Sequence, residues 1–158
     1  MLINQKKINK GVILMRNHRC NAFFAEKHLA GGNDMWKSDE YYLEKAIEVS
    51  RKSRAGGNTP FGCVLVDGDG EIILEQGNVE ITEKRCTGHA ETVIMERASK
   101  LYDKKFLWNC TLYTTCEPCP MCAGAVYWGN VGKVVYAMTE ERLLQMTGSH
   151  EQNPTFTM

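Results

Sequence analysis

The chain has 158 residues, of which 43% are hydrophobic and 24% are charged, and this balance is typical of one globular domain with its own core. The formal net charge is zero, but residues 1–37 carry seven Lys and Arg against two acids, whereas residues 38–158 carry twelve against seventeen. The acidic larger part argues against a surface that grips a nucleic-acid backbone, because such a surface needs clustered cations.

Residues 1–37 are expected to form a poorly ordered extension, and residues 38–158 the folded domain. The apolar run at residues 11–15 is far shorter than a membrane span. A targeting leader is the alternative, since basic residues outnumber acids, although the segment is not rich in serine. Seven cysteines are an odd number, and without a signal-peptide pattern they favour reduced thiols and a cytoplasmic location.

The first expected elements are a helix and a hairpin. Ser38 is a typical N-cap, acids follow it, and apolar residues recur at helical spacing to about Arg54. Residues 61–67 and 71–76 are expected to form two strands, which the turn Asp67-Gly68-Asp69-Gly70 joins.

A polar loop, residues 77–88, leads to a helix expected over residues 89–102. Residues i and i+2 of a regular helix point apart. His89 and Glu91 can therefore share a site only if His89 lies at the very start of this helix.

The remaining elements alternate between strand and helix. We expect a strand at 111–115, a helix opened by Pro118 at its first position, a strand at 133–137 and a helix at 139–145. This order predicts an α/β fold with a mixed sheet, in which the last two strands are parallel and joined by a right-handed crossover.

Two short motifs carry the chemistry: His89-Ala90-Glu91, and Pro118-Cys119-Pro120-Met121-Cys122. One histidine and two cysteines are ligands that Zn²⁺ accepts, and three protein ligands leave the fourth tetrahedral position open, as in catalytic sites. A structural zinc knuckle or a redox pair is the alternative for the C-x-x-C alone. A structural zinc site normally has a fourth Cys or His, and none pairs with these residues at metal spacing.

H-x-E followed by P-C-x-x-C is the signature of zinc deaminases, and over roughly residues 41–146 the chain resembles the cytidine/deoxycytidylate deaminase superfamily. Its similarity is to the branch that holds guanine deaminases, nucleoside deaminases and the tRNA adenosine deaminase. The resemblance implies a three-layer α/β/α sandwich around a mixed sheet, a homodimer, and Glu91 as catalytic proton shuttle beside zinc held by His89, Cys119 and Cys122. Backbone N–H groups near Ala90 and Cys119 are expected to stabilise the developing oxyanion.

The resemblance also implies substrate contacts: Asn78 hydrogen-bonds the base, Phe61 stacks on it, and Trp128 and Ala90 line the pocket. The alternatives are a turn asparagine with positive φ, and ordinary core positions for the two aromatic residues. Glu140, Glu141 and His150 are further candidates to reach the pocket, although a solvated helix face is the favoured role for the two glutamates.

Guanine, deaminated to xanthine with release of ammonia, is the expected substrate. Adenosine in tRNA, guanosine and cytidine are the alternatives. A degenerate deaminase-fold binding protein is the non-enzymatic alternative, and such a protein would be expected to have lost Glu91 or a metal ligand.

Overall fold

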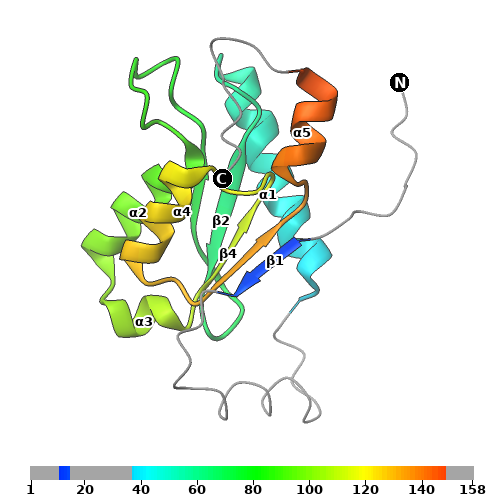
Figure 1. Cartoon of the computed structure of the whole chain (residues 1–158). Helices are drawn as coiled ribbons and strands as arrows, with labels where there is room; N and C mark the ends of the chain where they lie inside the picture. The colour runs from blue at the N-terminus through cyan, green and yellow to red at the C-terminus, as the bar shows by residue number, and fades with distance from the viewer. Residues whose placement is uncertain (1–10, 15–36, 149–158) are drawn as a thin grey trace.

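The computed structural model describes residues 11–14 and 37–148, which form one five-stranded sheet with helices on both faces (Figure 1). The strands lie in the order β1-β5-β4-β2-β3. Only β4 and β5 pair in parallel, whereas the other neighbours are antiparallel. The predicted hairpin, the mixed sheet and the parallel last pair are therefore confirmed. The elements in chain order are β1 (Gly11–Leu14), α1 (Asp39–Ala55), β2 (Gly62–Val66), β3 (Ile72–Gly77), α2 (Ala90–Leu101), α3 (Lys104–Trp108), β4 (Thr111–Thr114), α4 (Pro120–Gly129), β5 (Lys133–Tyr136) and α5 (Glu140–Thr147).

Helix α1 covers one face of the sheet. Ser38 is its N-cap, and the Ser38 hydroxyl accepts a hydrogen bond from the Tyr41 N–H at 3.3 Å, as the sequence predicts. The buried side chains of this layer come from the helix and from alternate strand positions: Tyr42, Leu43, Val49, Val64, Val66, Tyr113 and Val135. The helix is thus fixed to the sheet by apolar burial, the main favourable term in folding.

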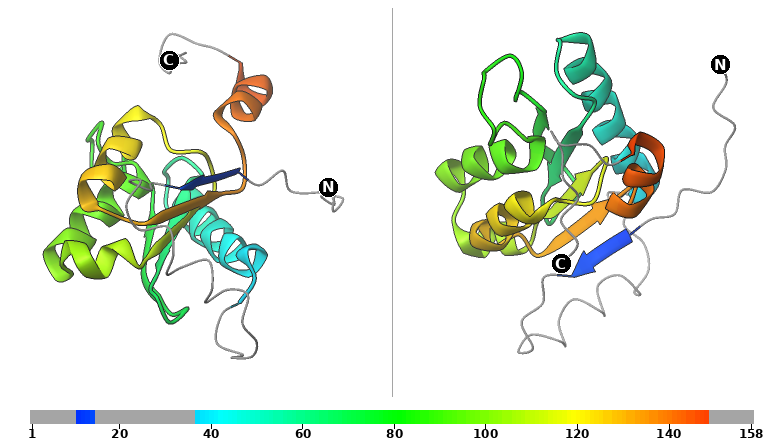
Figure 2. Two further views of the ribbon diagram at one scale, coloured as in Figure 1. Left: turned by 60° about the horizontal axis from the view of Figure 1, so that its bottom comes forward. Right: turned by 45° about the horizontal axis from the view of Figure 1, so that its top comes forward.

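Helices α2 and α4 lie on the opposite face (Figure 2, left), so the predicted three layers are present. The buried side chains between these helices and the sheet include those of the other strand positions, among them Cys63, Leu65, Leu112 and Val134. Side chains alternate between the faces of a strand. Thr114 therefore lies on the same face of β4 as Leu112, toward α2.

Two elements were not predicted. Strand β1 comes from within the predicted extension, and its short apolar run pairs with β5, which gives β5 a neighbour on that side. Residues 1–10 and 15–36 lie outside the described residues, so the prediction of a poorly ordered segment stays a prediction. The short helix α3 begins after Asp103, whose carboxylate accepts from the Phe106 N–H at 2.7 Å.

No helix within the described ranges is both long and apolar enough to cross a bilayer.

The backbones of α1 and β2 come into close contact at Gly62. A Cβ at this position would lie 2.5 Å from the Ser50 nitrogen and 2.8 Å from the Ala46 carbonyl oxygen. Both are main-chain atoms of α1, which cannot rotate away as a side chain could.

We therefore expect Gly62→Ala to lower the free energy of unfolding by about 1–3 kcal/mol, the usual cost of overpacking. Gly124→Ala is the matched control, because a Cβ at Gly124 meets no atom within 4 Å and alanine favours a helix. The denaturant midpoint measures both variants. Equal stability of Gly62→Ala and the wild type would contradict the close packing.

Candidate metal centre and active site

The site is built from the first residues of two helices. His89 is the N-cap of α2 with φ −66° and ψ 142°, and Cys119 is the N-cap of α4 with φ −62° and ψ 168°. Both residues have extended backbone, so the directions of their side chains do not follow the regular helical period. This confirms that His89 lies at the very start of its helix, as sharing a site with Glu91 requires.

The start of α4 corrects one prediction. Pro120, not Pro118, occupies the first helical turn. Either proline fits a first helical position, because its missing N–H costs nothing there, and the sequence does not choose between them. Starting two residues later makes Cys119 the N-cap and puts Cys122 at the third helical position, and side chains at these two positions face each other.

The three predicted metal ligands converge. Nδ1 of His89 lies 3.6 Å from Sγ of Cys119 and 3.7 Å from Sγ of Cys122, and all three ligand atoms lie within 4.8 Å of one another. A tetrahedral zinc with bonds of about 2.3 Å to sulfur and about 2.0–2.1 Å to nitrogen separates such N and S atoms by roughly 3.6 Å. The donor set fits Zn²⁺, the cofactor of this site. No other His, Cys, Asp or Glu of the described ranges joins the group, so one tetrahedral position is left for water or substrate.

The pKa values of the Cys119 and Cys122 thiols are shifted in opposite directions. The pKa of Cys119 is lowered to about 4, chiefly because the Cys122 thiol and His89 are hydrogen-bonded to it. The pKa of Cys122 is raised, because it is the donor of this pair and is buried. Hydrogen bonding to Cys119 also raises the pKa of His89, and bound zinc favours neutral imidazole and thiolate ligands.

Glu91 is buried beside these ligands, with 6% of its surface exposed. Its Oε1 accepts a hydrogen bond from the Thr114 hydroxyl at 2.5 Å, and its Oε2 lies 3.5 Å from Sγ of Cys122. One carboxylate oxygen is thus held by the sheet while the other faces the metal centre. This is the arrangement that a proton shuttle needs.

Backbone donors are available at both helix starts. Ala90 is the first residue of α2 and is fully buried. The N–H groups of the first helical turn have no intrahelical acceptor, and the positive end of the helix dipole lies there. The predicted oxyanion donors, Ala90 and Cys119, therefore lie where backbone N–H groups could meet negative charge.

Asn78 lies just after β3 and is 2% exposed. Its Oδ1 accepts from the Glu80 N–H at 2.9 Å, while its backbone N–H donates to the Phe61 carbonyl at 3.0 Å. Positive φ is found at Lys84 and Asn130 among non-glycine residues of the described part, not at Asn78. The alternative of a turn asparagine is therefore wrong about a positive φ, although the bond from the Glu80 N–H gives Asn78 the role of a turn residue. Phe61 is partly buried next to it, just before β2.

Trp128 is not brought to the site within one chain. It lies near the far end of α4, nine positions after Cys119, which corresponds to roughly 13 Å along a helix. Its side chain is 73% exposed and packs edge-on against Tyr127. The prediction that it walls the pocket is not supported by this geometry, because the ligands occupy the opposite end of the helix.

Glu140 lies on the metal-site side of α5. Its pKa is raised by burial and by the negative charges of Cys119, Glu117 and Glu91, and its N–H donates to the Glu117 carboxylate at 3.1 Å. Glu141 is exposed. His150, the third candidate near this end, lies outside the described residues.

Three contacts were missed by sequence reasoning: those of Thr114, Thr92 and Glu80. Thr92 Oγ1 lies 3.3 Å from Sγ of Cys122, and Glu80 Oε2 lies 3.8 Å from Nε2 of His89. Strand alternation could have placed Thr114 toward α2. No sequence signal marks the other two, because their roles depend on how a helix turn and a loop meet the ligands.

A recess of about 300 Å³ lies elsewhere, between the end of α1 and β3. Its lining includes Asn78, Lys52 and Gln76, but neither Glu91 nor any metal ligand. We therefore place the chemistry at the helix starts rather than in this recess.

The purified protein is expected to bind close to one zinc ion per chain. Cys119→Ala and Cys122→Ala should each lose most of the metal, because removing one ligand leaves only two. Metal content by atomic absorption tests this, with Cys86→Ala as the control, since Cys86 is exposed and outside the ligand group. Full zinc content in both ligand variants would refute the assignment.

Comparison with known proteins agrees with this geometry. Residues 36–138, which include both motifs, match the cytidine and deoxycytidylate deaminase zinc-binding region. A probable cytosine deaminase of Schizosaccharomyces pombe is 35% identical over 121 residues, 77% of this chain and 73% of the relative. A tRNA-specific adenosine deaminase of Bacillus subtilis is 45% identical over 98 residues, 62% of this chain and 60% of the relative. The X-ray structure of guanine deaminase from Bacillus subtilis matches with a TM-score of 0.64 and 32% identity, over 77% of this chain and 86% of that one. The chain therefore belongs to the cytidine and deoxycytidylate deaminase family, whose zinc-binding region it contains.

Proposed function

We propose that the chain catalyses the hydrolytic deamination of a nucleobase or nucleoside, with guanine, converted to xanthine, as the first candidate. The observation that carries the reaction type is the Glu91 carboxylate, buried and aimed at a centre of one imidazole and two thiol ligands. The metal ligands and the proton shuttle are all present together. This argues against a degenerate binding protein, which has no need for the complete set.

When bound, zinc supplies Lewis-acid chemistry and lowers the pKa of water toward neutrality. Glu91 takes one proton from the attacking water while the water oxygen bonds to the ring carbon that bears the amino group. The carboxyl group gives this proton to the ring nitrogen, then takes the second proton of the former water from the new hydroxyl group and passes it to the leaving amine. The C–N bond breaks and ammonia departs, so that water and the amine give a carbonyl and ammonia. The N–H groups of Ala90 and Cys119 offer donors for the negative charge that develops.

The substrate assignment rests on the loop after β3. Asn78 keeps its Nδ2 donor and a second lone pair on Oδ1 for a base edge, because the Glu80 N–H occupies one lone pair only. Phe61 lies beside Asn78 through a backbone hydrogen bond and is the candidate stacking residue. The structural likeness to a guanine deaminase supports a purine base. Because two relatives are named as a probable cytosine deaminase and a tRNA-specific adenosine deaminase, cytosine and tRNA adenosine must be assayed beside guanine.

A small substrate is favoured over a nucleic acid by charge. Residues 38–158 carry seventeen acids against twelve Lys and Arg, and Glu140 and Glu80 lie near the metal ligands. Such a surface repels phosphates. A homodimer, predicted from the family resemblance, stays a prediction, and the exposed Tyr127 and Trp128 are its candidate contacts.

Glu91→Gln is expected to keep zinc and fold but to lose at least about a hundredfold in kcat, because general acid–base catalysis contributes on the order of 10²–10⁴-fold. Ammonia release measures the rate, and metal content confirms the centre. A loss of less than about tenfold would rule out the shuttle role.

Thr114→Val is the companion variant in this assay, since it removes only the hydroxyl that holds Glu91 Oε1. A hydrogen bond to a charged group contributes about 1.5–3 kcal/mol, so kcat should fall by about tenfold or more with little change in KM. Thr111→Val is the control, because Thr111 is also buried on β4 but lies on the other face.

Substrate preference is tested by kcat/KM for guanine, guanosine, cytosine, cytidine and a tRNA anticodon loop with adenosine. We expect the highest kcat/KM for guanine. Asn78→Ala should lower this value by several orders of magnitude, because buried polar groups left unpaired disfavour a substrate strongly. Faster turnover of another substrate, with guanine unaffected by Asn78→Ala, would overturn the substrate assignment and leave the reaction type intact.

A further inference from the structure

We propose that Glu80 is a positioning residue, whose carboxylate fixes the imidazole of His89 in the orientation that the metal requires. The proposal rests on the metal centre alone and is independent of which base is the substrate. It assigns a role to a residue outside both sequence motifs.

The two nitrogens of His89 face in different directions. Nδ1 lies 3.6 and 3.7 Å from the two cysteine sulfurs, whereas Nε2 lies 3.8 Å from Oε2 of Glu80. This is an ion-pair distance, from which a small side-chain movement gives a hydrogen bond. A metal-bound histidine commonly donates its other N–H to a carboxylate, which fixes the tautomer and raises the basicity of the ligand nitrogen. Glu80 is placed for this contact.

Glu80 is itself held by its backbone. Its N–H donates to Asn78 Oδ1 at 2.9 Å, and its carbonyl accepts from the Arg85 N–H at 3.1 Å. A Cβ at Gly88 would lie 2.6 Å from both the nitrogen and the Cα of Glu80. The residue just before His89 therefore packs directly on the Glu80 main chain, and only glycine leaves room for this approach.

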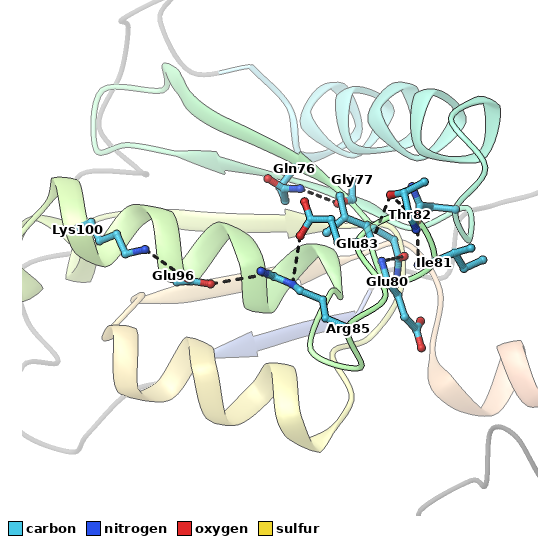
Figure 3. A network of polar contacts seen from close by, with 12 residues as sticks. Gln76, Gly77, Glu80, Ile81, Thr82, Glu83, Arg85, Glu96 and Lys100 are labelled. Carbon is cyan, nitrogen blue, oxygen red and sulfur yellow. Dashed lines mark hydrogen bonds and ion pairs between the residues drawn. The ribbon is translucent and has the colours of Figure 1, made fainter.

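The loop has a second anchor in Asn58, which is 5% exposed. Its Oδ1 accepts from the N–H groups of Ile81 and Thr82 at 3.1 and 3.0 Å. Figure 3 shows Glu80, Ile81 and Thr82 together in this network. The main chain around Glu80 is thus fixed from both sides, so its carboxylate is presented to His89 by a supported turn.

Neighbouring acids are engaged elsewhere. Glu83 pairs with Arg85 at 3.3 Å, and Glu96 pairs with Arg85 at 3.7 Å and Lys100 at 2.9 Å (Figure 3). Glu83 is therefore a matched control: it is an acid of the same loop, and its carboxylate pairs with Arg85 rather than with a metal ligand.

The expected effect is moderate. Loss of such outer partners typically weakens metal binding by about 10–100-fold. The side chains of His89 and Glu80 are 36% and 40% exposed, and water screens their interaction. We therefore expect zinc affinity to fall by about tenfold, near the lower end of this range.

The experiment measures zinc affinity of the full chain by competition with a chromophoric chelator, for wild type, Glu80→Ala, Glu80→Gln and Glu83→Gln. Glu80→Ala should bind zinc about tenfold more weakly, and Glu80→Gln, which keeps an acceptor oxygen, should recover part of the loss. Glu83→Gln should match the wild type. The absorption bands of the cobalt-substituted protein should shift in Glu80→Ala and stay unchanged in Glu83→Gln.

Zinc affinity within about twofold of the Glu83→Gln control in both Glu80 variants would overturn the proposal. If Glu80→Ala fails to fold, Glu80→Gln against Glu83→Gln decides alone, because both keep side-chain size. These readouts need no substrate, so a wrong assignment of the reaction would leave their outcome unaffected.

Discussion

The packing of α2 against α4 is the constraint on which the site depends. Each helix contributes an N-cap ligand, His89 or Cys119, and neither helix could form the centre alone. Residues buried between these helices and the sheet, such as Ile94 and Val126, hold the two N-termini together. Apolar burial, which is not directional, thereby sets the relative positions of three directional metal ligands. The positive ends of two helix dipoles also meet where thiolates form.

The same packing buries the carboxylate that would move protons. Glu91 follows His89 by two positions, so the N-cap geometry turns His89 toward the cysteines while Glu91 points to the sheet and meets Thr114. Thr114 faces α2 because β4 alternates, with Leu112 on the same side and Tyr113 on the other. The strand register therefore decides which hydroxyl supports the carboxylate. Burial of a charged group is unfavourable in free energy unless the group is hydrogen-bonded, and the Thr114 hydroxyl donates such a bond to Glu91.

The loop between β3 and α2 connects Asn78, the proposed base contact, to the metal ligand His89. Asn78 accepts the Glu80 N–H, and the Glu80 carboxylate faces His89. One backbone segment therefore links the two ends of this short chain of contacts. Asn58 holds the segment against the end of α1. Substrate contact and metal geometry are expected to respond together when this loop is altered.

From the sequence alone we predicted the candidate metal ligands, the candidate proton shuttle and most elements of the sheet, because these follow from local rules of ligand chemistry, periodicity and turns. The sequence also required His89 to begin its helix, since i and i+2 side chains otherwise diverge. Tertiary structure alone decided that Pro120 rather than Pro118 begins α4, that β1 pairs with β5, and that Trp128 is remote from the ligands. Tertiary structure also decided the contacts of Thr114, Thr92 and Glu80. Such features depend on which surfaces meet in space, and neither spacing nor composition along the chain records that.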